Sequence, residues 1–379
     1  MKTLFQHILL FDAEACTQKP ADLLITNGMI AKIAESIVPE DDMIVYNMEN
    51  AYVSDGWVEA HTHMDWENGQ LCLDTQTTYP SDGITYAVDA GTNGPTNYKI
   101  VHDKMARMPI PTKAYLNVAL NGTCRAGREL LSSELLDKAA FRTVYEQYKD
   151  EIIGVKIRID PRVNADTLGT LAQSRELADE LGLPLIIHPT RCTDPLEKVL
   201  SYLKENDVFA HTYSALEPCI LDEAGRVKEC VLEARKRGVW FDLSHGSSNF
   251  SFDIARKSMD QGFVVDTIST DLHTANITGP VRSMADTMSK MLYLGMPMQE
   301  IIRRVTTAPA KMLGLKDRSF GISEGKEANL TFFRVNEGKF RLVDSYRTEV
   351  IADQRINVIL TVLGEKTFSP RSCIRMAKP

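Results

Sequence analysis

The sequence has little of what marks secreted, membrane-bound or nucleic-acid-binding proteins. Its seven cysteines are scattered over 379 residues without a Cys-x-x-Cys pair, which favours reduced thiols in the cytoplasm over a disulfide framework. No apolar stretch reaches the roughly 20 residues that a membrane-spanning helix needs. A signal peptide is not expected, because His7, Asp12 and Glu14 interrupt the apolar N-terminus. The net charge is −8 and no basic run occurs, which argues against a nucleic-acid partner.

A glycine-rich dinucleotide-binding fingerprint is also missing after every predicted strand, which disfavours a doubly wound open sheet. Short apolar runs alternate with amphipathic stretches, a pattern typical of a parallel sheet. Eight such strands, which match the size of a (β/α)8 barrel, are predicted at residues 52–63, 85–89, 113–119, 152–159, 185–188, 208–211, 239–243 and 265–271. Helices are predicted at residues 133–148, 167–181, 194–204, 222–237, 281–293 and 298–313.

Both ends of the chain have the pattern of strands without helices. Strands are predicted at residues 21–26, 29–33, 329–335, 340–343 and 358–362, with a turn at Asn27-Gly28. The N-terminal strands are too few to bury a core alone. We therefore predict one small discontinuous β-sandwich domain from residues 1–50 and 322–379, and a barrel from residues 51–321.

Side chains that can bind a metal gather at the ends of the predicted strands. His61 and His63 close the first strand, and side chains at i and i+2 share a face, so both can point at one metal ion. His188, His211 and Asp271 end the fifth, sixth and eighth strands. Each of these three alone is more often structural than a ligand. Their joint position matches the C-terminal face, where barrels keep their active sites.

Lys156, in the fourth predicted strand, is the unusual member, because an ammonium group cannot bind a cation. Burial lowers the pKa of a lysine, and the neutral amine can take up carbon dioxide as a carbamate. A carbamate offers two oxygens that can bridge two metals. The alternative is a lysine paired with a carboxylate, and the sequence leaves it open.

The set His61-Thr62-His63, Lys156, His188, His211 and Asp271 resembles the amidohydrolase superfamily. Residues 20–30, 306–315 and 325–330 are also similar to it, so the likeness covers nearly the whole chain. The resemblance implies a metal-dependent hydrolase on a (β/α)8 barrel with a β-sandwich built from both termini. The lysine in the fourth strand is similar to the binuclear dihydroorotase-like and deacetylase-like subgroup, which includes proteins described as adenine deaminases.

The resemblance also implies a ligand set. His61, His63 and Asp271 would hold one divalent metal, most readily Zn²⁺, while His188 and His211 hold a second and N6-carboxylated Lys156 bridges them. Dihydroorotases place an arginine shortly after the His-x-His pair. Here residues 64–67 are Met-Asp-Trp-Glu, so dihydroorotase activity itself is not expected.

The activity implied by this resemblance is hydrolysis of an amide or ester bond in a small carboxylate-bearing molecule. The bond would belong to an N-acyl group, an O-acyl group or a cyclic amide, attacked by a metal-bridging hydroxide with Asp271 as the catalytic proton acceptor. A purine (adenine-type) aminohydrolase is the alternative. A non-catalytic scaffold is disfavoured, because no predicted ligand is missing.

Candidate substrate contacts are Arg158, Asn93, His245 and His273, which follow or end predicted strands. Each has a structural alternative: a surface ion pair for Arg158, an ordinary turn residue for Asn93, and a structural role for the two histidines. We expect a small-molecule substrate and neither a nucleic-acid nor a membrane partner. The sequence leaves open whether the chain forms a homo-oligomer.

Overall fold

The computed structural model describes residues 1–12, 17–64, 73–123, 129–315 and 320–370. Its strands are β1 (Lys2–Asp12), β2 (Thr17–Thr26), β3 (Met29–Ala34), β4 (Met43–Asp55), β5 (Trp57–Thr62), β6 (Ile84–Asp89), β7 (Thr112–Asn117), β8 (Ile152–Arg158), β9 (Leu185–His188), β10 (Val208–Phe209), β11 (Trp240–Phe241), β12 (Asn329–Val343), β13 (Glu349–Leu363) and β14 (Lys366–Phe368). Its helices are α1 (Thr75–Ser81), α2 (Tyr98–Met105), α3 (Lys138–Gln147), α4 (Thr167–Leu181), α5 (Leu196–Ser201), α6 (Glu229–Lys236), α7 (Phe252–Asp260), α8 (Met284–Tyr293), α9 (Met298–Val305) and α10 (Thr307–Met312), with a 3-10 turn at Ser133–Leu135.

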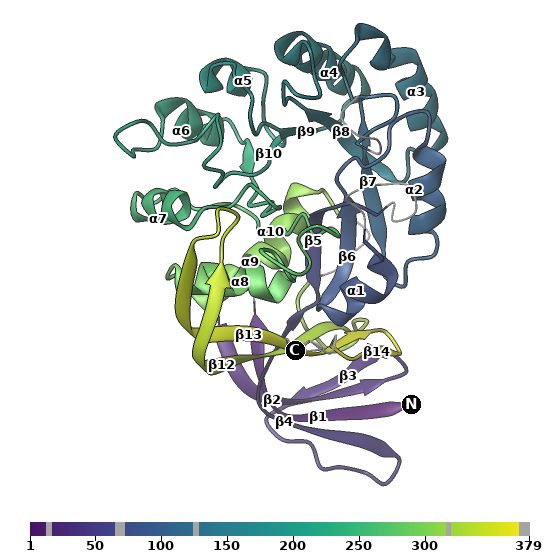
Figure 1. Ribbon diagram of the computed structural model, residues 1–379. Helices are drawn as coiled ribbons and strands as arrows, with labels where there is room; N and C mark the ends of the chain where they lie inside the picture. Colours follow the sequence, from purple (N-terminus) through teal and green to yellow (C-terminus); the bar gives the residue numbers. More distant parts are fainter. Residues whose placement is uncertain (13–16, 65–72, 124–128, 316–319, 371–379) are drawn as a thin grey trace, which may run out of the picture.

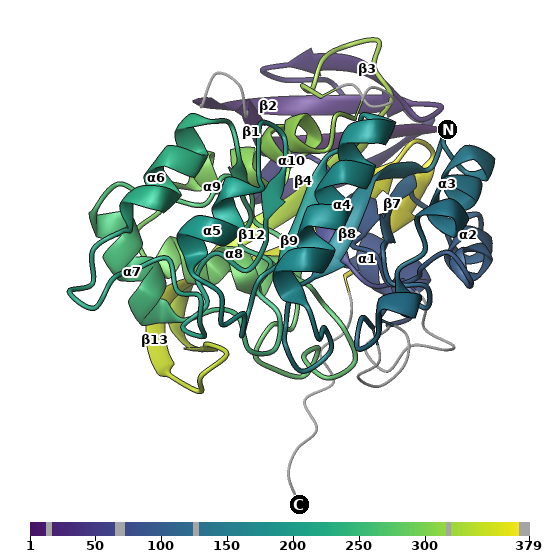
Figure 2. The ribbon, with the colours of Figure 1, turned by 90° about the horizontal axis from the view of Figure 1, so that it is seen from above.

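The first of two sheets is parallel and contains β5 to β11 in chain order. Every residue of β5 and β6 is buried, as expected for parallel strands that are covered on both faces. Helices α4 to α7 lie on the outside of the parallel sheet, and β1 to β3 lie along one side of it (Figure 2).

The eighth predicted barrel strand, residues 265–271, closes the ring without forming a regular strand. Asp242 pairs with Thr267 on one side, and Leu272 pairs with Thr62 of β5 on the other, each as a single parallel bridge. The backbone N–H of Asp271 also donates to the carbonyl of His61 at 2.8 Å. The sheet is therefore a closed barrel whose last strand joins its first through a few hydrogen bonds.

The second sheet joins the two ends of the chain, in the order β14-β13-β12-β4-β1-β2-β3 (Figure 1). Its core contains Phe5, Leu23 and Val53 from the N-terminal strands packed with Phe332 and Val362 from the C-terminal ones. Because β4 runs from Met43 to Asp55 and ends directly before β5, this sheet continues into the first barrel strand.

Two predicted helices are shorter than expected for identifiable reasons. The helix predicted at 298–313 breaks at Thr306, because Pro309 lacks the N–H that a continuous helix would need and is tolerated only in the first turn of α10. The helix predicted at 222–237 begins only at Glu229, because Leu221 and Val227 form a β-bridge around a turn.

The strands predicted at 329–335 and 340–343 are one strand, β12, with a register shift between Glu337 and Phe340.

Within the described ranges, no helix combines the length and the apolar character that crossing a bilayer requires.

Candidate metal centre

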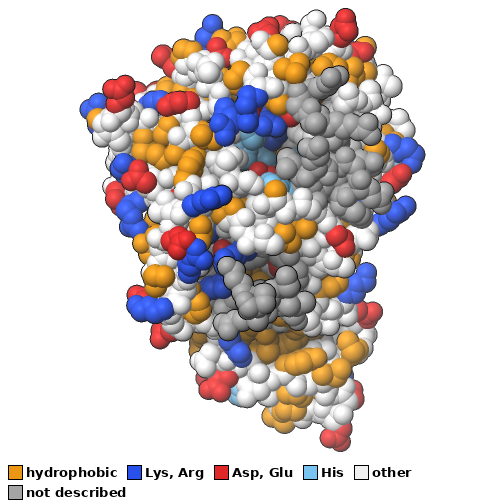
Figure 3. Space-filling view, viewed as in Figure 1, with side chains coloured by type: hydrophobic (Ala, Val, Ile, Leu, Met, Phe, Trp, Pro, Cys, Tyr) orange, Lys and Arg blue, Asp and Glu red, His pale blue; other side chains and the backbone are white. Residues whose placement is uncertain are grey.

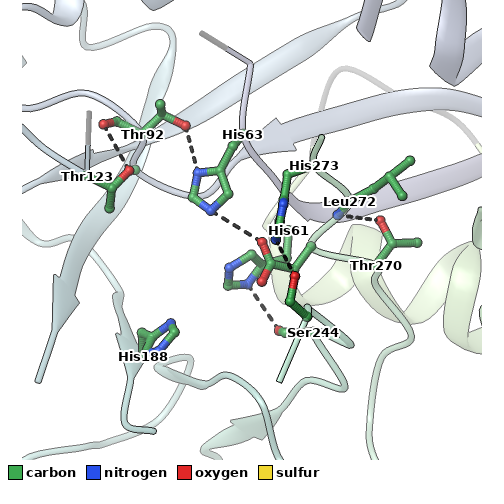
Figure 4. Close-up of polar contacts among 12 residues, drawn as sticks. His61, His63, Thr92, Thr123, His188, Ser244, Thr270, Leu272 and His273 are labelled. Carbon is green, nitrogen blue, oxygen red and sulfur yellow. Dashed lines mark hydrogen bonds and ion pairs between the residues drawn. The ribbon is translucent and has the colours of Figure 1, made fainter. Parts of the chain in front are cut away.

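The six predicted metal-binding side chains converge at the C-terminal ends of the barrel strands. His63 Nε2 lies 3.3 Å from Asp271 Oδ1, and His211 Nε2 lies 2.7 Å from His188 Nδ1. Lys156 Nζ lies 3.5 Å from His61 Nε2. Ligand atoms of His61, His211 and Asp271 all lie within 4.8 Å of one another. Figure 4 shows the rings of His61, His63 and His188 around one space.

Ser244, which follows β11, orients two of the histidines. Its hydroxyl donates to Asp242 Oδ2 and therefore accepts from His61 Nδ1, at 3.0 Å. Its carbonyl accepts from His211 Nδ1 at 2.6 Å. Because Nδ1 carries the proton in both rings, the bare Nε2 of each ring is directed toward the cluster. One residue thus fixes the tautomers of two predicted ligands.

Hydroxyl groups also contact the other two histidines. Thr92 donates its hydroxyl to Asp89 Oδ2 at 2.7 Å and accepts from His63 Nδ1 at 2.7 Å. Thr190 Oγ1 lies 2.5 Å from His188 Nε2. In metal sites such outer hydrogen bonds fix the orientation of the ligand histidine and raise its basicity.

Burial sets the charge of the cluster. It lowers the pKa of His211 to about 4, and it lowers the pKa values of His61 and His188 well below the ordinary value. These imidazoles are therefore neutral at pH 7, which is the form that binds a metal. Burial also lowers the pKa of Lys156 to about 8. No carboxylate among the described residues lies within ion-pair distance of the Lys156 ammonium.

The contact between His63 and Asp271 tests whether a cation fits here. Asp271 Oδ1 is buried without a hydrogen-bond partner among the described residues. It faces His63 Nε2, which is an acceptor once Nδ1 donates to Thr92. Two acceptors at this distance need a positive charge between them, so the donor set fits a divalent metal. The neighbouring His63 holds the pKa of Asp271 below its usual range, against the effect of burial.

Three residues of the site have backbone conformations that side chains other than glycine rarely adopt. The φ angles of His211, Ser244 and Asp271 are 61°, 40° and 48°. Non-glycine residues in this left-handed region cost free energy and cluster at functional sites. His211 stands two residues after β10, Ser244 two residues after the bridging Asp242, and Asp271 one residue before the bridging Leu272.

Three of the four candidate substrate contacts, Arg158, His245 and His273, have partners outside the cluster. The guanidinium of Arg158 donates to Glu129 at 3.0 Å and to Asp160 at 3.1 Å. Asn93 is buried in the loop after β6. His245 Nε2 lies 2.8 Å from Lys290 Nζ, and His273 Nε2 lies 3.0 Å from the hydroxyl of Ser247. Their role in substrate binding stays a prediction. Of the sequence Met-Asp-Trp-Glu at residues 64–67, which includes Trp66, only Met64 belongs to the described residues.

Sequence reasoning missed the side chains behind the histidines. Ser244, Thr92 and Thr190 each lie one to three residues beyond the last residue of a strand run, and Asp89 and Asp242 stand two or three residues before Thr92 and Ser244. A hydroxyl shortly after a strand-end carboxylate is the signal that could have found two of them. The signal is weak, because such residues are also ordinary turn formers.

The hydroxyl of Thr92 provides a direct test of this support. Replacing Thr92 by valine should lower the affinity for divalent metal roughly 10- to 100-fold, because His63 loses the acceptor that fixes its tautomer. Titration of metal-free protein against a chromophoric chelator measures the change. The matched control is Thr123→Val, which removes a hydroxyl whose hydrogen bond within the described part of the chain is to the Thr92 carbonyl. Equal affinities for both variants would contradict the role of Thr92.

The cluster is open to solvent on one face of the molecule. Histidine side chains are visible within a hollow in Figure 3, with lysine and arginine side chains on its edge. His63 and Asp271 keep 9% and 10% of their side-chain surface exposed, whereas His61 keeps only 1%. His188 is also only partly buried, so a small molecule entering the hollow would meet His188, His63 and Asp271 before His61.

Comparisons with known proteins agree with this arrangement. The chain is 28% identical over 370 residues to a deacetylase from Enterococcus faecalis, covering 95% of this chain and 98% of the relative. It is 26% identical to a deacetylase from Agrobacterium fabrum, covering 88% and 83% of the two chains. A solved adenine deaminase superposes with a TM-score of 0.86 and 26% identity, covering 97% and 99% of the chains.

A solved dihydroorotase superposes with a TM-score of 0.88 at 23% identity, covering 97% of this chain and 98% of that one, and shares its fold. The predicted (β/α)8 barrel with a second β domain is confirmed. The model of the amidohydrolase family matches residues 52–364. The chain therefore belongs to the amidohydrolase family, as a metal-dependent hydrolytic enzyme that acts on carbon–nitrogen bonds other than peptide bonds.

Proposed function

We propose that the protein is a binuclear deacetylase that removes an acyl group from a small carboxylate-bearing molecule. The observation that carries this proposal is the buried cluster, in which four oriented histidines surround a lysine and an aspartate. The deacetylase relative from Enterococcus faecalis supports it, since the alignment spans almost the whole of both chains. Amide and ester bonds of acyl groups, and cyclic amides, all present a carbonyl that such a site can attack.

Two metals, most readily Zn²⁺, would divide the cluster between them. His61, His63 and Asp271 would hold one, while His188 and His211 hold the other. Lys156 would bridge them as a carbamate, formed when its neutral amine bonds to carbon dioxide and releases a proton. Its lowered pKa, about 8, keeps a fraction of the amine neutral at pH 7. When bound, the metals would polarise the substrate carbonyl and acidify water.

Residues of the chain would supply proton transfer and orientation. Asp271 is ionised at neutral pH, so its carboxylate can take the proton of the attacking water and deliver it to the leaving nitrogen or oxygen. Thr92 and Ser244 keep the histidine rings in one tautomer while this proton moves. The products are a carboxylate and an amine or alcohol. One proton of the attacking water reaches the leaving group through Asp271, and the other is taken up by the amine product or, after ester cleavage, released to solvent.

An adenine-type aminohydrolase is the second candidate, favoured by the structural match to an adenine deaminase. Water would then add to the amidine carbon of a purine, and ammonia would leave. The two candidates share the same cluster and differ only in the group that enters the hollow.

A turnover screen separates these candidates. We expect zinc-loaded protein to hydrolyse N-acyl amino acids or acyl hydroxy acids faster than cyclic amides or adenine. Faster release of ammonia from adenine would instead establish the aminohydrolase.

Metal removal tests the enzyme itself. Dialysis against a chelator should abolish turnover, and added Zn²⁺ should restore it, with two metals per subunit by elemental analysis. A chain purified under metal-replete conditions with neither bound metal nor turnover would instead indicate the non-catalytic scaffold.

We further propose a cytoplasmic location and a small molecule as the main partner. The cysteines Cys192, Cys219 and Cys230 are free thiols, which supports a reducing compartment. A homo-oligomer is compatible with this proposal.

A further inference from the structure

The hairpin formed by β12 and β13 leaves the second sheet and reaches the barrel. Figure 1 shows its turn beside α7, far from the strands with which β12 begins. The turn consists of residues 344–348, and Asp344, Ser345 and Tyr346 carry the contacts. We call these three residues the hairpin tip.

Ser345 attaches the hairpin tip to the loop after β11. Its hydroxyl donates to the carbonyl of Gly246 at 3.0 Å and accepts from the N–H of Phe250 at 3.2 Å. Its backbone N–H donates to the carbonyl of Phe250 at 3.0 Å. Three hydrogen bonds from one serine therefore set the distance between the two ends of this loop.

Tyr346 and Asp344 extend the attachment on either side. The Tyr346 hydroxyl donates to the carbonyl of Ser248 at 2.9 Å and accepts from the N–H of Ala215 at 2.9 Å. It thus joins the loop after β11 to the loop after β10. Asp344 Oδ2 accepts from the N–H of Phe252 at 3.1 Å, at the start of α7.

The loop held in this way is part of the metal centre. Gly246 lies so close to Asp271 that a Cβ at position 246 would be 2.7 Å from Asp271 Oδ2. Its N–H donates to the Thr270 carbonyl at 3.0 Å, and its φ is 55°. Two residues earlier, Ser244 orients His61 and His211. A shift of the loop would therefore move both Asp271 and these histidines.

The barrel provides only one other attachment to the Gly246 carbonyl among the described residues. His245 Nδ1 lies 2.9 Å from this oxygen, and His245 Nε2 is bound by the buried Lys290. The carbonyl is thus held between a histidine of the barrel and a serine of the second sheet.

We propose that Ser345 and Tyr346 are positioning residues of the active site. Through the peptides of Gly246 and Ser248, the hairpin tip holds the loop after β11 against Asp271, so that the second sheet contributes to turnover as well as to stability. This inference goes beyond the proposed function, because it does not depend on which acyl group is cleaved.

The test compares Ser345→Ala with Ser345→Thr, which keeps the hydroxyl. The alanine variant should lower kcat about tenfold with KM nearly unchanged, because small misplacements of reacting groups are costly. The threonine variant should restore most of the rate. Tyr346→Phe, whose ring stays in place, should show a similar loss and serves as a second probe if Ser345→Ala does not fold.

A measurement without substrate separates this inference from the proposed function. Cobalt-loaded protein absorbs visible light according to the geometry of its ligands, so Ser345→Ala should shift the bands relative to wild type. Arg341→Ala is the matched control, because it removes an exposed ion pair with Glu349 on the same hairpin. Wild-type spectra and rates for Ser345→Ala and Tyr346→Phe would overturn the inference, as would equal changes in Arg341→Ala.

Discussion

Asp271→Asn should lower kcat roughly 10²- to 10⁴-fold, the usual contribution of a general acid–base group. Asparagine has nearly the same shape, so the fold should survive, but its amide can neither take a proton from water nor carry the negative charge that the cluster needs. Steady-state kinetics with zinc-loaded protein measures the rate, and thermal unfolding measures the stability. We expect a change in Tm of no more than a few degrees.

Asp266→Asn is the control for this prediction. Asp266 lies in the same barrel segment, but its carboxylate accepts from the N–H of Phe241 and pairs with Arg235, away from the cluster. This variant should keep its kcat and lose some stability. If Asp271→Asn also retained wild-type turnover, Asp271 would not be the group that moves the proton.

Lys156→Ala should produce the largest loss of bound metal. Removing the amine removes the proposed bridge, so we expect the metal content to fall from two per subunit to one or fewer, with turnover lost in parallel. The lysine stem packs against the backbone of Gly91, where a Cβ would lie 2.5 Å from it. Alanine therefore leaves a cavity, which a small carboxylic acid such as propionate could enter to restore part of the metal content.

Lys104→Ala, which removes another buried lysine on α2, controls for the loss of a buried amine. Its metal content should stay at the wild-type value. Unchanged binuclear occupancy in Lys156→Ala would rule out the bridge, and nuclear magnetic resonance of ¹³C-bicarbonate-treated wild type should detect the carbamate carbon directly.

Five of the six predicted ligands could be placed from sequence because each stands at or near the end of a recognisable apolar run, whereas Lys156 lies within one. In a barrel, strand ends meet at one face, so residues far apart such as His61 and His211 needed no further information to be placed together. The barrel and the β domain built from both chain ends were also predicted from sequence. The alternation that indicates a strand can be recognised from a few neighbouring residues, so the order of strands and helices could be assigned along the chain.

The supporting contacts could not be predicted in the same way. The Ser345 hydroxyl reaches Gly246 across 99 residues of sequence, and neither residue stands in a pattern that indicates the contact. The same holds for Arg158, whose ion pairs with Glu129 and Asp160 depend on how a loop folds back. Side-chain partners set by loop conformation leave no periodic trace in the sequence.

Residues 265–272 are joined by single bridges to Thr62 of β5 and to Asp242, just after β11. This junction has a consequence for how a newly synthesised chain folds and binds metal. Thr270 binds Glu59, 211 residues earlier in the sequence, so the ring can close only after nearly the whole barrel has been synthesised. Asp271 and the pair His61 and His63 meet at that junction. Metals bound there would act as a cross-link between the first and last strands, so a nascent or truncated chain would hold them poorly.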